Sequence, residues 1–316
     1  MKKVYLAGHE GMVGSAILRS IRNRDIFDIV TATHKELDLT NQLDTRSFIN
    51  KHKPDLIIIS AAKVGGIVAN SLYPADFLYI NILIQSNLIQ SAFSEGVSKL
   101  LFLGSSCIYP KFSLQPIKEE YLLSGKLEPT NEPYAIAKIS GLKLCEAFNI
   151  QHDTDYRSLM PTNLYGPSDT YHDQDSHVIP ALIKRFHEAK LRKTEKVSVW
   201  GSGSPKREFL YVDDLANACI DIINIDKADY WKKVPKINSH INIGTGEDIS
   251  IKDLSKKIAS TVNYKGKIDF DESKPDGTPR KLLNIDMMKS FGIRPKVLLD
   301  NGLNYTYQDY LKNYLK

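Results

Sequence analysis

Lys3-Val-Tyr-Leu-Ala-Gly8-His-Glu-Gly11-Met-Val-Gly14 is the stretch that decides the fold. Its short apolar start predicts a strand, and the glycines that follow lead into a helical pattern that runs to Asn23. Glycines at this spacing permit a tight turn and let the backbone approach a pyrophosphate at the helix N-terminus. We therefore expect a dinucleotide-binding loop; a glycine-rich turn without a ligand is the alternative.

Beyond this loop, β-branched runs alternate with helical patterns as far as residue 160, which is typical of βαβ units. Further strands are expected at 29–32, 56–60, 99–103 and 156–160, and helices at 42–52, 74–93 and 133–149. The sequence thus predicts an α/β fold, a doubly wound parallel (Rossmann) sheet with a smaller, discontinuous α/β lobe. We expect residues 1–165 and about 208–245 to bind the dinucleotide, with the chain returning to the sheet around 212–225 and 240–243. Residues from about 166 to 207 and from 246 to 316 would form the substrate lobe.

Composition narrows the class of protein. The 316 residues are 42% hydrophobic and 25% charged, and no apolar run reaches the roughly 18 residues of a membrane span. Three cysteines and eight histidines show no metal-binding spacing, so we expect no metal. The net charge of +5 is dispersed, which excludes a nucleic-acid stripe but suits an anionic small ligand. A cytoplasmic location is expected, because the apolar stretch after Met1-Lys2-Lys3 is too short for a signal peptide.

The residues after the expected second strand bear on cofactor choice. Thr31-Ala-Thr-His-Lys35 lacks the acidic residue that would bind a ribose 2′-hydroxyl, which favours NADPH over NADH. His34 or Lys35 could meet a 2′-phosphate or be solvated loop residues. Glu10 opposes NADPH, because its carboxylate would repel that phosphate. We predict NADP(H) as cofactor and leave NAD(H) open.

Two further motifs carry chemistry. Tyr134 and Lys138 stand four residues apart on one helical face, where a cation can lower the pKa of a phenol that protonates a carbonyl oxygen. An exposed helix face would also explain them. Ser105 and Cys107 follow the fourth strand, at the carboxyl edge where open α/β sheets bind ligands. Ser105 would bond a keto oxygen beside Tyr134, and a loop thiol could shuttle protons, whereas Cys145 and Cys219 lie in helical patterns and are expected to pack.

Together these motifs resemble the GDP-L-fucose synthase family of extended short-chain dehydrogenases/reductases. The resemblance spans nearly the whole chain and rests on the segments 62–70, 104–110, 128–138, 160–166, 176–180, 200–203, 207–210 and 274–280. Members of that family often carry arginine where this chain has Glu10 and His34.

The resemblance implies NADPH-dependent conversion of GDP-4-keto-6-deoxy-D-mannose to GDP-L-fucose, by epimerisation at C3 and C5 and reduction at C4. It implies that Cys107 and His177 are the acid–base pair, although His177 alone could be an exposed loop residue. It implies a GDP-sugar site of Arg185, Trp200, Arg207 and Asp276, where Trp200 could instead be a core aromatic.

The resemblance also implies a homodimer through the helices of residues 77–93 and 134–149. The implied cofactor site comprises Gly8, His9, Glu10, Gly11, Met12, Val13, Gly14, His34, Lys35, Asp38, Leu39, Leu103, Gly104, Ser105, Ser106, Lys138, Pro161, Thr162, Asn163, Leu164 and His177.

Three alternatives remain open at this point. The first is a sister C4 reductase of another GDP-4-keto-6-deoxy sugar, such as a heptose or a 3,6-dideoxyhexose, and retention of both Cys107 and His177 argues against it. The second is a nucleotide-sugar dehydratase, which needs an acidic pair where this chain has Ser106 and Cys107. The third is a cofactor-binding redox sensor, against which Ser105, Tyr134 and Lys138 speak.

Overall fold

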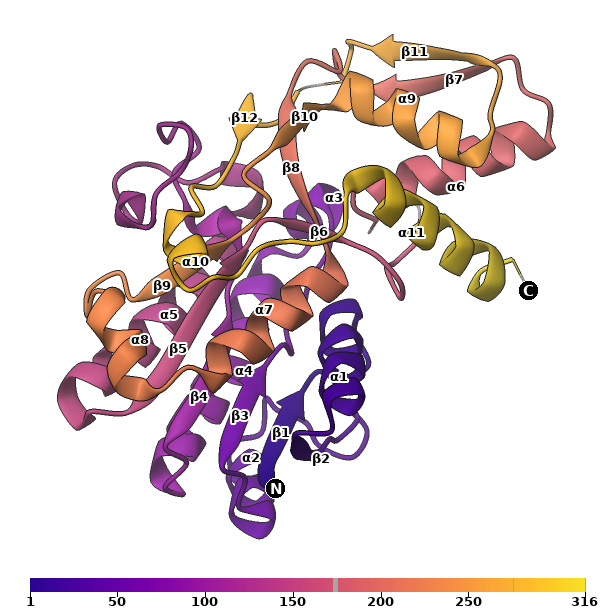
Figure 1. Ribbon diagram of the computed structural model, residues 1–316. Helices are drawn as coiled ribbons and strands as arrows, with labels where there is room; N and C mark the ends of the chain where they lie inside the picture. Colours follow the sequence, from indigo (N-terminus) through magenta and orange to yellow (C-terminus); the bar gives the residue numbers. More distant parts are fainter. Residues whose placement is uncertain (173–175, 275, 316) are drawn as a thin grey trace.

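A computed structural model describes residues 1–172, 176–274 and 276–315, and a parallel sheet lies at its centre (Figure 1). Among the described residues this sheet has six strands, in the order β2-β1-β3-β4-β5-β9. The strands are β1 (Lys2–Ala7), β2 (Phe27–Val30), β3 (Leu56–Ile59), β4 (Lys99–Leu103), β5 (Asp155–Pro161) and β9 (His240–Ile243). The chain adds β2 on one side of β1 and then adds β3, β4, β5 and β9 in turn on the other side. The doubly wound Rossmann-type fold is therefore confirmed, with its switch point between β1 and β3.

Helices cover both faces of the sheet. On one face α1 (Met12–Arg24) packs against α7 (Val212–Asn224). On the other, α4 (Pro74–Ser94) packs between α2 (Gln42–His52) and α5 (Glu132–His152). The shorter helices are α3 (Ile67–Leu72), α8 (Lys227–Lys233) and α10 (Asp286–Ser290), with 3-10 turns η1 (Ser106–Ile108), η2 (Glu119–Tyr121) and η3 (Pro129–Asn131).

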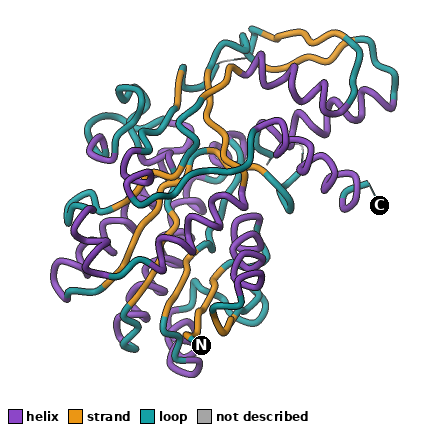
Figure 2. The backbone as a smooth tube through the Cα atoms, in the orientation of Figure 1, coloured by secondary structure: helices purple, strands orange, loops and turns teal. Residues whose placement is uncertain are grey.

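A second group of elements lies beyond the carboxyl edge of the sheet (Figure 2). Strand β8 (Lys206–Tyr211) pairs with β6 (Asn163–Tyr165), β10 (Asp248–Ser250) and β12 (Arg280–Lys281), and β7 (Lys196–Trp200) pairs with β11 (Lys267–Asp271). The helices are α6 (Val178–Leu191), α9 (Ile251–Val262) and α11 (Leu299–Asn313). These elements enclose their own apolar core, which includes Phe186, Phe209 and Leu254.

Two local expectations differ from the structure. Strand β2 begins at Phe27, two residues before the expected start, because Lys2 to Tyr5 of β1 pair with Phe27 to Val30. The segment 212–225 returns as helix α7 and not as a strand; its buried residues Val212, Leu215 and Cys219 recur at helical spacing. The expected end of the long helix is confirmed, since Gly96 has a φ of +76° just beyond α4.

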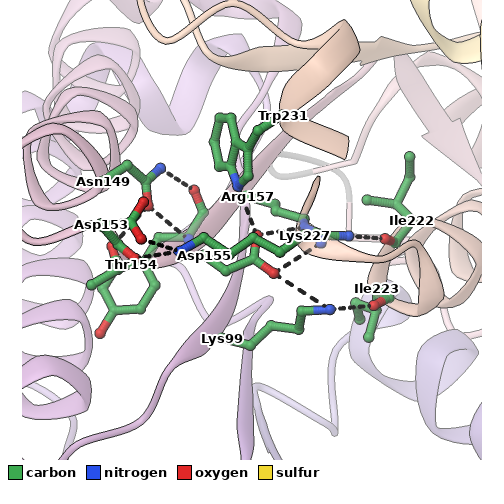
Figure 3. Close-up of polar contacts among 11 residues, drawn as sticks. Lys99, Asn149, Asp153, Thr154, Asp155, Arg157, Ile222, Ile223, Lys227 and Trp231 are labelled. Atoms are coloured by element: carbon green, nitrogen blue, oxygen red, sulfur yellow. Dashed lines mark hydrogen bonds and ion pairs between the residues drawn. The ribbon is translucent and has the colours of Figure 1, made fainter. Parts of the chain in front are cut away.

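The amino ends of β4 and β5 are anchored by a buried ionic cluster (Figure 3). The guanidinium of Arg157 donates to both carboxylate oxygens of Asp155 at 2.8 Å and also binds the carbonyl of Ile222. Lys99 donates to the carbonyl of Ile223 at 2.8 Å. Because these carbonyls end α7, the two cations fix that helix against the sheet, at the edge opposite the candidate site.

Within the described ranges, none of the helices is long and apolar enough to cross a membrane. Nor does any group of three metal-ligating side chains occur in the described part of the chain.

Candidate active site

The glycine loop after β1 has the shape that a dinucleotide requires. Gly8 has a φ of +85°, and a Cβ there would lie 2.6 Å from the backbone of Ala61. A Cβ at Gly14 would lie 2.0 Å from the carbonyl oxygen of Gly8, so only glycine lets α1 approach the loop. No side chain caps α1 at Gly11. The amides of Met12 and Val13 in its first turn therefore suit a pyrophosphate.

The same loop holds a buried nitrogen without a partner. His9 Nδ1 accepts and donates no hydrogen bond within the described chain. Together with the uncapped helix end, this orphaned nitrogen fits a polar ligand in the loop.

The turn after β2 would face the adenosine end of that ligand. His34 and Lys35 are exposed there, as is Glu10 in the glycine loop. An acidic residue that the sequence pattern did not indicate also lies in this turn: the carboxylate of Glu36 accepts from the amide and hydroxyl of Thr33, at 2.8 and 2.9 Å. These bonds from Thr33 lower the pKa of Glu36. Glu36 directly follows Lys35 in the sequence, but its bonds to Thr33 are visible only in three dimensions.

The next two expected cofactor residues serve the local backbone. The carboxylate of Asp38 accepts from the amide and hydroxyl of Thr40, at 2.9 and 2.7 Å. The carbonyl of Leu39 accepts from Asn87 on α4 at 2.9 Å. Both residues therefore shape the loop beside the expected adenosine site.

Tyr134 and Lys138 lie in the first two turns of α5, directly beside the end of β4. The Nζ of Lys138 donates to the carbonyl of Leu103 at 2.9 Å and lies 5.8 Å from the centre of the Tyr134 ring. Burial lowers the pKa of Lys138 to about 8 and raises the pKa of Tyr134. The expected lowering of the phenol's pKa by the lysine is not seen in the chain alone, where burial of the phenol is the largest cause of its shift.

Ser105 and Cys107 occupy the turn η1 at the carboxyl end of β4. The Ser105 hydroxyl accepts from the Cys107 amide at 3.3 Å, and as a hydroxyl it is also able to donate. Cys107 is buried, and burial raises the pKa of its thiol, while Lys281, Ser105 and Lys138 act in the opposite direction. The thiol also influences the titration of both Tyr134 and Lys138. Because the turn η1 is also in contact with α5, Cys107 lies in one site with the Tyr134/Lys138 pair.

The other two cysteines are packing residues, as expected. Cys145 in α5 and Cys219 in α7 are fully buried in the main core. Burial raises the pKa of Cys145 to about 12 and raises the pKa of Cys219 as well.

A buried polar network that the sequence did not reveal holds the Cys107 turn from behind. The hydroxyl of Tyr109 donates to Asn242 Oδ1 at 2.5 Å and lies 2.8 Å from His240 Nε2. Burial lowers the pKa of His240 to about 3, so this imidazole is neutral. The network ties the turn to β9, a contact between residues 131 or more positions apart in the chain.

The loops after β5 complete the carboxyl edge. The Thr162 amide donates to the carbonyl of Ile243 at 2.9 Å, and Asn163 donates to the carbonyl of Glu208 at 2.8 Å. Pro161 ends β5, and Leu164 lies in β6. His177 occupies the N-cap position of α6, where its exposed side chain makes no capping hydrogen bond. The surrounding protein lowers the pKa of His177.

The expected GDP-sugar residues lie along the second lobe. The guanidinium of Arg185 lies 6.0 Å from the ring centre of Trp200, which is 59% exposed and so is not a core aromatic. The carboxylate of Asp276 accepts from the amide and hydroxyl of Ser202, at 3.0 and 2.7 Å. Burial lowers the pKa of Arg207, and the nearby charge of Asp276 acts in the opposite direction. The four residues therefore form a strip that runs from β7 to β8.

Lys281 joins this strip to Cys107 and was missed by the sequence analysis. It pairs with Arg207 in the register of β12 and β8, and it lines a cavity of about 40 Å³ together with Cys107, Glu128 and Lys111. Lys111 binds Glu128 at 2.8 Å. Burial lowers the pKa of Lys281, while the charges of Cys107 and Glu128 raise it. In the sequence, Lys281 could have been found from its place directly after residues 274–280, one of the segments on which the family resemblance rests.

A glycine loop that suits a dinucleotide, a Tyr/Lys pair and a neighbouring thiol thus lie at one edge of the sheet, which is the arrangement of a reductase-type site. The chain belongs to the NAD dependent epimerase/dehydratase family, whose model matches residues 4–244. It is 53% identical to GDP-L-fucose synthase 1 of Arabidopsis thaliana over 98% of this chain and 94% of that protein. It is 52% identical to GDP-L-fucose synthase of Escherichia coli, over 99% and 97%. The resemblance stated from the sequence is confirmed.

Among solved structures, the chain is similar to MlghC, a GDP-mannoheptose C4 reductase from Campylobacter jejuni with NADP bound. The TM-score is 0.89 and the identity 36%, over 98% of each chain.

Proposed function

We propose that this chain converts GDP-4-keto-6-deoxy-D-mannose to GDP-L-fucose, by epimerising C3 and C5 and then reducing C4 with NADPH. The observation that carries the proposal is the position of Cys107 beside Tyr134 and Lys138 at the carboxyl end of β4. A reductase needs the Tyr/Lys pair, and an epimerase needs a further group that exchanges protons with carbon.

The dinucleotide would be held by residues 8–14, by the turn that contains His34, Lys35, Asp38 and Leu39, by residues 103–106 and 161–164, and by Lys138 and His177. When bound, it supplies the hydride that reduces the C4 ketone. Lys138 stays in place through its bond to the Leu103 carbonyl and would meet the nicotinamide ribose.

Protein groups account for the proton steps. A ketone at C4 makes the hydrogens on C3 and C5 acidic, and hydrogen bonds from Ser105 and Tyr134 would stabilise the enolate. Cys107 and His177 would remove and return protons on opposite faces of the sugar. After hydride transfer Tyr134 would protonate the C4 oxygen, and burial, which keeps its phenol protonated, suits that role.

The nucleotide end of the substrate would lie on the strip along the second lobe. Arg207 and Lys281 would meet the diphosphate, because arginine and lysine suit phosphate oxygens. The exposed Trp200 ring, with Arg185 beside it, would flank the sugar or the base. Asp276 would hold the 201–202 turn at the same end through Ser202.

Activity is tested by the loss of NADPH absorbance with GDP-4-keto-6-deoxy-D-mannose, followed by NMR identification of the product. GDP-L-fucose as product supports the proposal. If the intact chain and Tyr134→Phe both bind NADPH, and the intact chain still oxidises none of it at high enzyme concentration, the proposal is contradicted.

A second candidate is C4 reduction of a GDP-heptose, which the similarity to the GDP-mannoheptose C4 reductase favours. The same assay with a GDP-4-keto-6-deoxyheptose distinguishes the two, because a response to the heptose alone selects the second candidate.

We further propose that the chain acts in the cytoplasm as a homodimer joined through α4 and α5. Tyr79 on α4 and Ile136 on α5 support this, since their side chains are 65% and 42% exposed. Light scattering tests the dimer, which Ile136→Glu is expected to dissociate. The two lobes, with boundaries near residues 165, 208 and 245, remain part of this proposal, and the two separate apolar cores support it.

A further inference from the structure

The loop that leads to His177 is held by the C-terminal part of the chain. It runs from the end of β6 at Tyr165 to the start of α6 at Val178. Residues 173–175 lie outside the described part of the chain, and the described contacts of the loop involve residues 166–172 and 176–177.

Tyr171 is the centre of this contact. Its ring lies 4.7 Å from that of Tyr310 on α11 and 4.6 Å from that of Tyr314, just beyond α11. Its hydroxyl donates to the carbonyl of Thr306 at 3.5 Å, and its side chain is 5% exposed. A loop side chain is thus packed among aromatic residues of the last helix.

Backbone bonds hold the same loop. The carboxylate of Asp309 accepts from the Ser168 amide at 3.1 Å, and the hydroxyl of Tyr314 donates to the Asp169 carbonyl at 2.5 Å. Ser168 has a φ of +66°, a conformation that a serine keeps only when its surroundings impose it. We name Thr306, Asp309, Tyr310 and Tyr314, with the Tyr171 ring they enclose, the C-terminal clasp.

The clasp reaches His177 through short contacts. Ser176, its neighbour in the chain, donates through its hydroxyl to the carbonyls of Thr170 and His172, at 2.8 and 2.5 Å. On the other side of His177, helix α6 is tied to α11 by His187, whose Nδ1 lies 2.9 Å from the hydroxyl of Tyr307. The C-terminal segment therefore holds the loop before His177, and α11 also contacts α6 further along, at His187.

We propose that the C-terminal clasp positions His177 for one of the two epimerisations, with Tyr314 as the positioning residue. This inference rests on the proposed function of His177. Tyr314 is 45% exposed and is not itself a member of the second core, so its replacement removes no core side chain. A displacement of the loop should slow the proton transfer that His177 performs, because misplacement by about 1 Å costs up to about a hundredfold in rate.

The test is solvent deuterium uptake at C3 and C5 of GDP-4-keto-6-deoxy-D-mannose. His177→Asn and Cys107→Ser first show which exchange depends on each residue. Tyr314→Ala is expected to slow the His177-dependent exchange by about tenfold or more while the KM for the sugar and NADPH binding change little. Tyr314→Phe, which keeps the ring and loses the bond to Asp169, should lie between Tyr314→Ala and the intact chain.

Tyr305→Ala is the matched control. Tyr305 lies on the same helix and is 54% exposed, but its ring faces Tyr211, at 6.0 Å, and not the loop. The control should exchange at the rate of the intact chain. Equal slowing of both exchanges in Tyr314→Ala, or no slowing of either, would overturn the proposal.

Failure of the proposed function is recognised separately. If the intact chain exchanges neither hydrogen, that function is wrong, and amide hydrogen exchange decides the clasp. The amides of Ser168 and Ser176 should then exchange at least about tenfold faster in Tyr314→Ala than in Tyr305→Ala. Unchanged protection of these amides would overturn the clasp as well.

Discussion

Replacement of Asp169 by asparagine should change how stability depends on pH. Asp169 is 4% exposed; one carboxylate oxygen accepts from the Thr170 amide at 2.8 Å, and the other has no partner in the described chain. The charge of this carboxyl also acts on the nearby phenols of Tyr171 and Tyr314. Burial raises its pKa to about 7, against about 3.9 in an unfolded chain. The folded state therefore favours the protonated acid.

The sign of the effect follows from this raised pKa. The stability supplied by the protonated acid is fully present below pH of about 4 and is lost as the pH rises to about 7. Asparagine cannot ionise. Each pH unit between the two pKa values corresponds to about 1.4 kcal/mol of stability. The free energy of unfolding of Asp169→Asn should therefore exceed that of the intact chain by about 2 kcal/mol at pH near 5.5 and by about 4 kcal/mol at pH near 8.5.

Urea denaturation from pH 5 to 9 measures this difference, and Asp309→Asn, at a half-buried neighbour on α11, serves as the control. A difference between Asp169→Asn and the intact chain that does not grow with pH would refute the reasoning. It would show that the Asp169 carboxyl ionises in the folded chain without cost.

Three other predictions concern separate parts of the molecule. Glu10→Arg should raise the preference for NADPH over NADH in kcat/KM by about tenfold or more, because repulsion of a 2′-phosphate becomes attraction; an unchanged ratio would place Glu10 away from that phosphate. Lys281→Gln should raise the KM for the GDP-sugar about tenfold, whereas Lys281→Arg should keep a KM near that of the intact chain. A change confined to kcat would argue against contact between Lys281 and the diphosphate. Arg157→Met should lower the free energy of unfolding by about 3 kcal/mol, because the buried carboxylate of Asp155 loses its main partner. A loss below about 1 kcal/mol in urea denaturation would mean that Lys99 alone compensates the charge of Asp155.

Features that depend on neighbouring residues could be predicted from the sequence. The glycine loop, strand β4 and helix α2 lie where expected, because strand and helix patterns and capping residues act over a few positions. The start of β2 could not be found in this way. It is set by pairing with β1, and as an edge strand it buries only Phe27 fully.

The candidate site was predictable in its motifs but not in its surroundings. Tyr134, Lys138, Ser105 and Cys107 belong to short motifs, and the structure brings them together. Lys281 reaches Cys107 only because β12 pairs with β8, a register that no local pattern encodes.

The titration of the Tyr134/Lys138 pair was also beyond sequence reasoning. The spacing of the two residues indicated attraction, whereas their depth in the structure makes burial the larger effect.

The most direct test of the central claim is NMR of the product formed from GDP-4-keto-6-deoxy-D-mannose and NADPH in deuterated water. We expect GDP-L-fucose with solvent deuterium at both C3 and C5 and hydrogen from NADPH at C4. Cys107→Ser and His177→Asn should each block epimerisation while NADPH still binds. A C4-reduced sugar without deuterium at C3 and C5 would contradict the proposal and leave only a C4 reductase.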